Sequence, residues 1–361
     1  MKAYRPVKAI IDLSALPKNL QVVRRYAPNA KVLAIIKSNG YGHGIERVAA
    51  QLAKADGFGV ACIDEAILLR QKGFLHRIVL LEGLFSETEL SLAIQHRFDF
   101  VIHSRLQLDW LIAANTSASL NIWLKIDTGM HRLGFLPKEL PHVLNQLKSI
   151  HADAPYCCMS HFAAADESDN KSADFTQQQL ALFLNLTHEE VATKSLANSA
   201  GVQRLPESHF DWVRPGIMLY GANAAHERVA GLHPVMTLMS EVIALKWLDA
   251  GETVGYGQTW QAPNKTLIAV VAIGYGDGYP RHAPSGTPVL IHGQQVPLVG
   301  RVSMDMITVD VTLLFNQMSI GDEVILWGKG LSVDVIAQAC GTIGYELLCG
   351  VTQRVPRIEA S

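Results

Sequence analysis

The chain has 361 residues, of which 49% are hydrophobic and 18% charged, and this predicts a globular protein of about two domains with a large buried core. Its formal net charge of −2 gives no reason to expect a nucleic acid or an anionic membrane as a partner. The five cysteines show neither zinc-ligand spacing nor the even count of a disulfide framework, and there is no signal-peptide core or membrane-spanning apolar run, so we expect a soluble, cytoplasmic protein without a metal site.

The first part of the chain alternates between predicted strands and helices. A strand at Val7–Ile11 precedes a helix that begins near Ser14 and ends near Tyr26. Eight apolar runs follow, most of them separated by amphipathic stretches such as 44–55, 64–71, 104–113 and 173–190. The runs cover 32–36, 58–62, 78–81, 100–102, 122–126, 156–159, 195–197 and 213–219. A doubly wound sheet would need fewer strands, so this α/β pattern predicts a (β/α)8 barrel of the TIM type.

The alternation of strands and helices stops near Tyr220, and from about Met236 onward the pattern is mostly β. Strands are predicted over 267–273, 288–291, 296–298, 307–311 and 323–326, with a hairpin at 292–294 and one short helix at 333–339. The sequence therefore predicts an N-terminal barrel and a separate C-terminal, mostly-β domain, with the boundary between residues 222 and 232.

Lys37 ends the first of the eight apolar runs and is followed by Gly40, Gly42 and Gly44. Such a lysine is either a solvated strand end or a desolvated amine that can form a Schiff base. The glycines would let backbone amides approach an anion, and the helix expected after them would favour one. An amine beside an anion cradle is what a pyridoxal 5'-phosphate site requires, but from this stretch alone both interpretations stay open.

Polar side chains stand at the ends of seven of the eight predicted strands. They are Lys37, Glu82, His103, Lys125, Asp127, Ser160, His161, Asn198, Ser199 and Arg214. The carboxyl ends of barrel strands form the active face, so these residues should meet at one mouth, where donors and cations would suit an anionic ligand. The loops at Ser199 and at Gly216-Ile217 follow the last two strands, the usual phosphate site of this architecture.

Three further residues lie among glycines, where each has an ordinary structural interpretation and a functional one. Arg132 belongs either to a tight turn or to a guanidinium clamp on a carboxylate or phenolate. Tyr256 and Tyr275 are either loop aromatics or phenols left accessible to a ligand, because their glycine neighbours have no side-chain bulk.

Nine motifs, in order and over nearly the whole chain, resemble those of the alanine racemase family, fold-type III enzymes that use pyridoxal phosphate. The motifs are Ala34–Gly44, Lys125–Gly134, Ser160–Phe162, Ala197–Ala200, Val213–Ile217, Gly255–Gly257, Gly274–Gly278, Gly300–Asp305 and Arg354–Arg357. The resemblance implies a homodimer in which the β domain of one chain completes the active site of the other. It also implies three units: an N-terminal strand (1–10) associated with the C-terminal domain, a cofactor-binding barrel (11–228) and a β domain (229–361).

The resemblance implies a two-base interconversion of L- and D-alanine that supplies D-alanine for peptidoglycan. Lys37 would hold the cofactor and act as one base, and Tyr256 from the partner chain would be the other. Tyr256 would remove the α-proton of L-alanine and Lys37 would return one, with the roles reversed for D-alanine.

The resemblance also implies roles for the surrounding residues. The cofactor would be bound by Tyr41, Asn198, Ser199, Gly216 and Ile217, with Arg214 facing the pyridine nitrogen and His161 behind it. The substrate would be contacted by Arg132 and by the backbone of Met304, the latter from the partner. Tyr275, Arg281 and Asp166 match residues that line the access corridor, and Lys125 matches a lysine that is carbamylated in some members. Gln353 stands where some members have a tyrosine that helps to hold the phosphate, so we expect a slightly different phosphate contact and no loss of activity.

Other functions fit the sequence less well. The glycine pattern resembles a Rossmann dehydrogenase, but Ile45 occupies the third glycine position. Non-catalytic barrels that bind pyridoxal phosphate lack the β domain that carries Tyr256 and Met304. Fold-type III decarboxylases place an acidic residue where this chain has Arg214. A racemase of broader specificity stays open, because a hydrophobic pocket discriminates one methylene by only about 1–3 kcal/mol.

Overall fold

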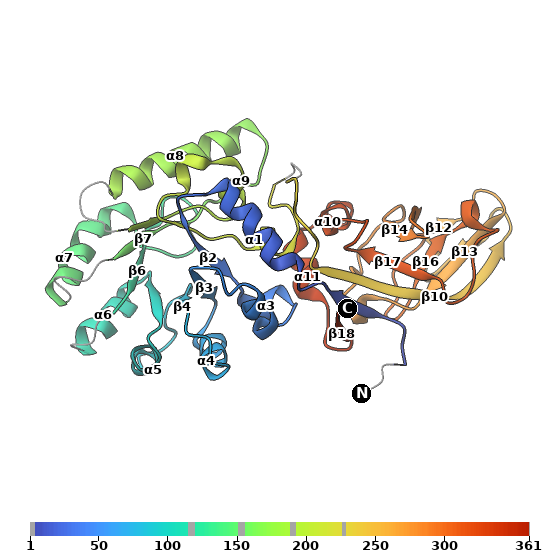
Figure 1. The fold of residues 1–361 in the computed structure, drawn as a ribbon. Coiled ribbons are helices and arrows are strands. Elements are labelled where there is room, and N and C mark those ends of the chain that lie inside the picture. Colours follow the sequence, from blue (N-terminus) through green and yellow to red (C-terminus); the bar gives the residue numbers. More distant parts are fainter. Residues whose placement is uncertain (1–3, 115–119, 151–155, 188–192, 226–228, 361) are drawn as a thin grey trace.

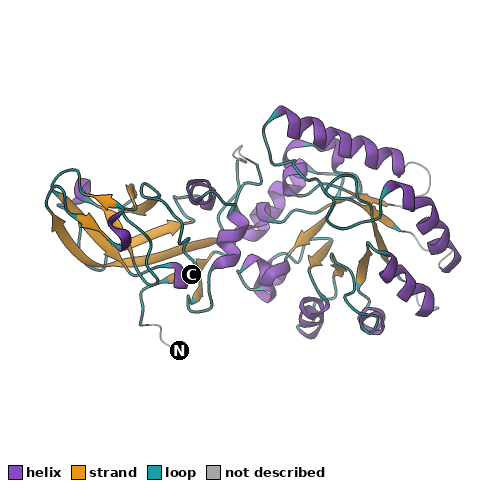
Figure 2. Ribbon diagram, turned by 180° about the vertical axis from the view of Figure 1, so that it is seen from behind, coloured by secondary structure: helices purple, strands orange, loops and turns teal. Residues whose placement is uncertain are grey.

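The computed structural model describes residues 4–114, 120–150, 156–187, 193–225 and 229–360. It shows an elongated molecule with a barrel at one end and a β domain at the other, joined through the long strand β10 (Met236–Leu248) (Figure 1). The barrel is surrounded by helices, whereas the other part is mostly strands and loops (Figure 2). None of the described helices is both long and apolar enough to cross a bilayer.

Eight parallel strands, β2 to β9 in chain order, close the predicted barrel. They are β2 (Lys31–Ile35), β3 (Gly57–Val60), β4 (Arg77–Leu80), β5 (Asp99–Ile102), β6 (Ile122–Lys125), β7 (Cys157–Met159), β8 (Thr193–Ser195) and β9 (Trp212–Val213). Most of their residues are fully buried because helices cover the outside and side chains such as Phe58, Phe100 and Trp123 fill the core. The prediction of a (β/α)8 barrel is confirmed.

The helices of this part follow the strands. They are α1 (Ala15–Tyr26), α2 (Lys37–Tyr41), α3 (Ile45–Gln51), α4 (Ile63–Gln71), α5 (Glu89–His96), α6 (Arg105–Ala114), α7 (Leu140–Ile150), α8 (Asn170–Leu186) and α9 (Ser199–Arg204). Residues 188–190, the end of the helical stretch predicted over 173–190, lie outside the described residues.

The last two barrel strands differ from their predicted ranges. β8 ends at Ser195 and β9 at Val213, so the predictions of strands over 195–197 and 213–219 were wrong in extent. Pro215 has no N–H for a ladder, and at Gly216 the chain leaves the extended conformation and enters a 3-10 turn, η3 (Ile217–Tyr220). The shortened strands leave Asn198 and Gly216 outside regular elements at the barrel mouth and place Ser199 at the start of α9.

The second part is built on one sheet whose main path is β15-β14-β17-β10-β1-β18, with β13 pairing both β10 and β16. The strands are β11 (Thr253–Val254), β12 (Trp260–Gln261), β13 (Thr266–Val271), β14 (Pro288–Ile291), β15 (Gln294–Pro297), β16 (Ile307–Asp310), β17 (Glu323–Trp327) and β18 (Arg357–Glu359). The helices are α10 (Val333–Cys340) and α11 (Gly344–Gly350). The separate, mostly-β domain is thus confirmed, and β14 and β15 form the predicted hairpin around His292-Gly293.

The N-terminal strand β1 (Lys8–Ile11) belongs to this sheet and not to the barrel. It pairs antiparallel with β10 and parallel with β18. The two ends of the chain are therefore tied together beside the junction of the two parts. The domain limit at 228/229 touches residues 226–228, which lie outside the described residues, and it stays a prediction.

Candidate active site

Lys37 follows β2 at the barrel mouth and begins a left-handed turn. Ser38, Asn39, Gly40, Tyr41 and Gly42 all have φ between 50° and 78°, so α2 is not a regular helix. The turn is internally bonded, with Gly40 N donating to Ile36 O at 2.8 Å and Gly42 N to Ser38 O at 3.0 Å. Gly44 N likewise donates to Asn39 O at 2.9 Å.

These bonds overturn one expectation about the glycines. The amides of Gly40, Gly42 and Gly44 are all used inside the loop, so they form no anion cradle. Their function is conformational, because glycine adopts positive φ without steric cost. The candidate anion site lies instead at the side-chain hydroxyl of Tyr41, which reaches Gly216.

The anion site is formed by residues from three loops. Gly216 N donates to the Ser199 hydroxyl at 2.8 Å, and a Cβ on Gly216 would overlap the hydroxyl of Tyr41. Asn198 caps α9 by accepting from Gly201 N at 2.9 Å, which fixes the backbone around Ser199. Ile217 is fully buried at the start of η3. The structure therefore brings together Tyr41, Ser199 and Gly216 as predicted.

Tyr345 is a residue of this site that the sequence did not reveal. It lies on α11, its ring centroid is 5.8 Å from that of Tyr41, and the Ser199 side chain is close enough to its hydroxyl to oppose the rise of its pKa. Burial raises the pKa of both Tyr41 and Tyr345, so both phenols stay protonated donors. The helix has seven residues with glycine at each end, a weak signal in sequence. Gln353, where we expected a departure at the phosphate, is exposed after α11.

Arg214 directly follows β9 at the barrel mouth and is buried, with only 4% of its surface exposed. It donates to Ser195 Oγ at 2.6 Å, to the carbonyl of Ser160 at 2.5 Å and to Nδ1 of His161 at 3.2 Å. Burial lowers the pKa of Arg214 to about 10, so it stays charged near neutral pH. Burial, reinforced by the Arg214 charge, lowers the pKa of His161 well below its ordinary value, so the imidazole is neutral.

A second buried cation lies close by, at Lys125 on β6. Burial, together with the charges of Arg214, Arg132 and Lys37, lowers its pKa to about 8, while Glu82 acts in the opposite direction. Glu82 Oε1 is also 3.9 Å from Nζ of Lys37. Among the described residues whose charges affect the pKa of Lys125, three are cations and only Glu82 is a carboxylate. With Lys125 itself this makes four cations and one carboxylate, an excess of positive charge that favours a ligand with several negative charges.

The Asp127 carboxylate shapes the loop that carries Arg132. It accepts from the backbone N–H of Gly129 at 2.9 Å and of His131 at 3.1 Å, and its second oxygen is 3.0 Å from the His131 ring. Burial raises the pKa of Asp127, but these hydrogen bonds outweigh it and hold the value below the ordinary range. Arg132 itself is exposed, with its guanidinium free to meet a ligand.

The predicted residues of the β domain are exposed. Tyr256 begins the turn η4 (Tyr256–Gln258), which directly precedes β12, and β12 lies far from the barrel strand β2 (Figure 1). Tyr256 is 68% exposed, and Met304 and Tyr275 are 52% and 39% exposed. Arg281 is exposed as well. One chain therefore contains both sets of residues but does not bring them together.

Asp166 lies after β7 and lines a cleft of about 670 Å³ between the barrel loops and the helices α10 and α11. Tyr220 and Tyr345 line the same cleft, so it leads toward the anion site. Its position agrees with an access route for a small molecule.

Comparisons with known proteins identify the family. The models of the alanine racemase N-terminal domain and C-terminal domain match residues 11–224 and 235–359. The alanine racemase of Coxiella burnetii is 48% identical over 360 residues, covering 97% of this chain and 98% of that protein.

Two solved structures give the same result. The biosynthetic alanine racemase of Pseudomonas aeruginosa superposes with a TM-score of 0.94 at 47% identity, covering 99% of this chain and all of that one. The enzyme of Bartonella henselae, described with covalently bound pyridoxal phosphate, has a TM-score of 0.88 at 29% identity and covers 98% of this chain and 99% of its own. The chain therefore belongs to the alanine racemase family, whose members are isomerases.

Proposed function

We propose that this alanine racemase interconverts L- and D-alanine with pyridoxal 5'-phosphate as cofactor and two bases from two chains. One observation carries the proposal: a lysine at the barrel mouth lies among buried cations and near the hydroxyl groups of Tyr41 and Ser199, which meet at Gly216. The product D-alanine would serve peptidoglycan synthesis in the cytoplasm.

The residues present fit this cofactor. Tyr41, Ser199, Tyr345 and the N–H of Ile217 would bind the phosphate, while the Gly216 N–H orients the Ser199 hydroxyl, and the cradle has room because Gly216 lacks a Cβ. The positive charge of Lys37, Arg132 and Arg214 would be neutralised by the phosphate, the phenolate and a substrate carboxylate. Pyridoxal phosphate supplies the electron-withdrawing group that makes the α-hydrogen of an attached amino acid acidic.

Arg214 would set the electronic character of the site. An arginine only donates hydrogen bonds and keeps its proton, so the ring nitrogen that it faces would act as an acceptor and stay unprotonated. The negative charge at Cα would then be withdrawn less strongly, which favours rapid reprotonation over side reactions. His161 supports this arrangement because its neutral Nδ1 accepts from Arg214.

The two bases would act from opposite faces of Cα. Lys37 would hold and move a proton at Nζ on one face, with Glu82 beside it. Tyr256 of the partner subunit would hold and move a proton at its phenol oxygen on the other face. The distance of β12, the strand after Tyr256, from β2 within one chain and the 68% exposure of Tyr256 support a homodimer with shared sites (Figure 1).

Arg132 and the Met304 backbone of the partner subunit would bind the substrate carboxylate and orient Cα. Tyr275, Arg281 and Asp166 would border the access route. Lys125 would carry a carbamate: its lowered pKa of about 8 leaves a useful fraction of neutral amine near neutral pH. That amine attacks CO2, forms an N–C bond and releases a proton, and the resulting anion would hold Arg132 by charge-assisted hydrogen bonds.

The test combines a spectrum with an assay. The purified protein should absorb in the visible range of protein-bound pyridoxal phosphate and form D-alanine from L-alanine. Lys37→Ala should abolish both the covalent absorbance band and the racemisation. A Lys37→Ala protein that keeps both would refute the proposal, and faster turnover of a larger amino acid such as serine would instead identify a racemase of broader specificity.

A further inference from the structure

The C-terminal segment Val351–Arg357 contacts two groups of candidate active-site residues in its own chain. One is the turn after Lys37, and the other is formed by the loops of Tyr275 and Met304. Arg357 contacts the first group. Its Nε donates to the carbonyl of Gly42 at 2.6 Å, and its two terminal nitrogens donate to carbonyls of the segment itself. The carbonyls of the segment belong to Val351 at 2.8 Å and to Thr352 and Val355 at 3.2 Å each. The guanidinium thus fastens the left-handed turn after Lys37 to the C-terminal segment.

The left-handed turn needs such fixing. This conformation is sterically unfavourable for a non-glycine residue, and Ser38, Asn39 and Tyr41 all adopt it. The conformation persists only if the surroundings impose it. At the other end of the turn, Glu65 accepts from Asn39 N at 3.1 Å and from Ala61 N at 2.9 Å. The turn that sets the positions of Lys37 and Tyr41 is therefore held by Glu65 from the barrel and by Arg357 from the C-terminal segment.

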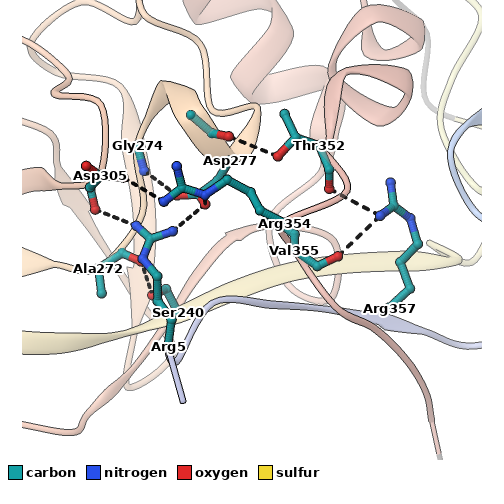
Figure 3. Close-up of polar contacts among 11 residues, drawn as sticks. Arg5, Ser240, Ala272, Gly274, Asp277, Asp305, Thr352, Arg354, Val355 and Arg357 are labelled. Atoms are coloured by element: carbon teal, nitrogen blue, oxygen red, sulfur yellow. Dashed lines mark hydrogen bonds and ion pairs between the residues drawn. The ribbon is translucent and has the colours of Figure 1, made fainter. Parts of the chain in front are cut away.

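Arg354, three residues earlier, contacts the second group (Figure 3). Its Nε is 3.0 Å from Asp277 Oδ1 and its Nη2 is 2.6 Å from Asp305 Oδ1. Asp277 is fully buried and is also paired with Arg5, and its second oxygen accepts from Gly274 N at 2.9 Å. This network anchors the turn η5 (Tyr275–Asp277).

The same network reaches Met304. Gly276 N donates to the carbonyl of Met304 at 2.9 Å, and Thr352 Oγ1 donates to the carbonyl of Gly276 at 2.9 Å. Arg354, Thr352 and Arg357 therefore form a continuous series of contacts from the Met304 loop to the turn after Lys37. In the shared-site dimer these two ends serve different active sites.

We propose that Arg357 and Arg354 are positioning residues for two different active sites. Arg357 acts on the Lys37 site of its own barrel, and Arg354 acts on the partner's site through Tyr275 and Met304. This inference rests on the shared-site dimer proposed above. A lysine cannot replace either arginine, because one ammonium cannot span acceptors that the planar guanidinium reaches together.

Cofactor binding tests the Arg357 half without an activity assay. Arg357→Lys should raise the dissociation constant of pyridoxal phosphate roughly tenfold or more. It should also speed amide hydrogen exchange at residues 38–44 of the cofactor-free protein. Arg47→Lys is the matched control, since Arg47 is near Arg357 but pairs with Glu359 at 3.5 Å. If Arg357→Lys does not fold, Glu65→Ala should give the same two effects from the opposite end of the turn. Unchanged cofactor affinity and exchange would overturn the role of Arg357.

Heterodimers then assign each arginine to a site. A dimer of one Lys37→Ala chain and one Tyr256→Phe chain, separated by different affinity tags, has a single complete site, with Lys37 from the Tyr256→Phe chain. Adding Arg357→Lys to that chain should lower the turnover number roughly tenfold, whereas adding it to the Lys37→Ala chain should not. Arg354→Lys should raise the KM for alanine only when it is in the Lys37→Ala chain, which supplies Met304.

The heterodimer experiment separates the two proposals. If the Lys37→Ala and Tyr256→Phe chains restore no activity together, the shared site is refuted. If they restore activity but each arginine variant has the same effect in either chain, the shared site stands and the assignment of the arginines is overturned.

Discussion

Nη2 of Arg214 lies 3.2 Å from Nδ1 of His161, and this contact defines the protonation of both side chains. Arginine can only donate, so Nδ1 is the acceptor and the imidazole proton is on Nε2. Burial and the neighbouring cations lower the pKa of His161 well below its ordinary value, which keeps the ring neutral.

Replacing His161 tests this relationship. His161→Leu removes the acceptor, so Arg214 should lose its orientation and the turnover number should fall roughly tenfold. His161→Gln keeps an acceptor oxygen and should lose less. The pH–rate profile should have the same shape in the wild type and in His161→Gln, because His161 does not titrate near neutral pH. If the pH–rate profile of the wild type has a limb that is absent from the profile of His161→Gln, the histidine titrates, and this would contradict a neutral His161.

Arg214 itself should control the balance between racemisation and side reactions. A carboxylic acid at this position could protonate the ring nitrogen and strengthen electron withdrawal. Arg214→Glu should therefore racemise roughly a hundredfold more slowly and release measurable pyruvate from alanine. Arg214→Lys, which stays cationic, should lose rate without gaining the side reaction. Equal pyruvate release from both variants would show that the charge at this position does not control the balance between racemisation and side reactions.

Lys125 should respond to added carboxylate if it functions as a carbamate. Lys125→Ala should lose most activity, and acetate should restore part of it by providing an anion beside Arg132. Lys125→Arg keeps a cation and should stay inactive with acetate. A carbamate should also appear as a labelled carbonyl resonance after incubation with carbon-13 bicarbonate. Full activity of Lys125→Arg would show instead that the cation is what the site needs.

The fold could be predicted from the sequence because its signals are local. Eight apolar runs at βα spacing define the barrel, and Lys37 and Arg214 follow two of its strands. The conformation after Lys37 could not be predicted, because distant residues impose it. Glu65 is 26 residues from its partner Asn39, and Arg357 is 315 residues from its partner Gly42. Tyr345 was missed because a seven-residue helix carries little periodic signal.

Asp99 gives the chain a pH-dependent stability that is independent of catalysis. It lies at the start of β5, where Trp123 Nε1 donates to it at 3.0 Å and Arg77 Nε is 3.3 Å away. Burial raises its pKa to about 6, although the Arg77 charge and the Trp123 hydrogen bond oppose the rise.

The sign of this effect is fixed by linkage. The folded chain binds a proton at Asp99 more tightly than the unfolded chain, so this stabilisation is present at about pH 4 and is lost as the pH rises through about 6. The loss is at most about 3 kcal/mol. Relative to Asp99→Asn, the wild type should therefore lose thermal stability as the pH rises from 4 to 7. A difference between the two proteins that does not change with pH would refute the raised pKa.

The exchange of the α-hydrogen with solvent deuterium tests the two-base arrangement most directly. Lys37 and Tyr256 of the partner subunit would act on opposite faces of alanine, so each base should exchange only one enantiomer. Tyr256→Phe should keep exchange of D-alanine, through Lys37, and lose exchange of L-alanine by roughly a hundredfold or more. Its bound cofactor should be retained. Equal loss for both enantiomers, or undiminished exchange of L-alanine, would contradict the assignment of Tyr256 as the base for L-alanine.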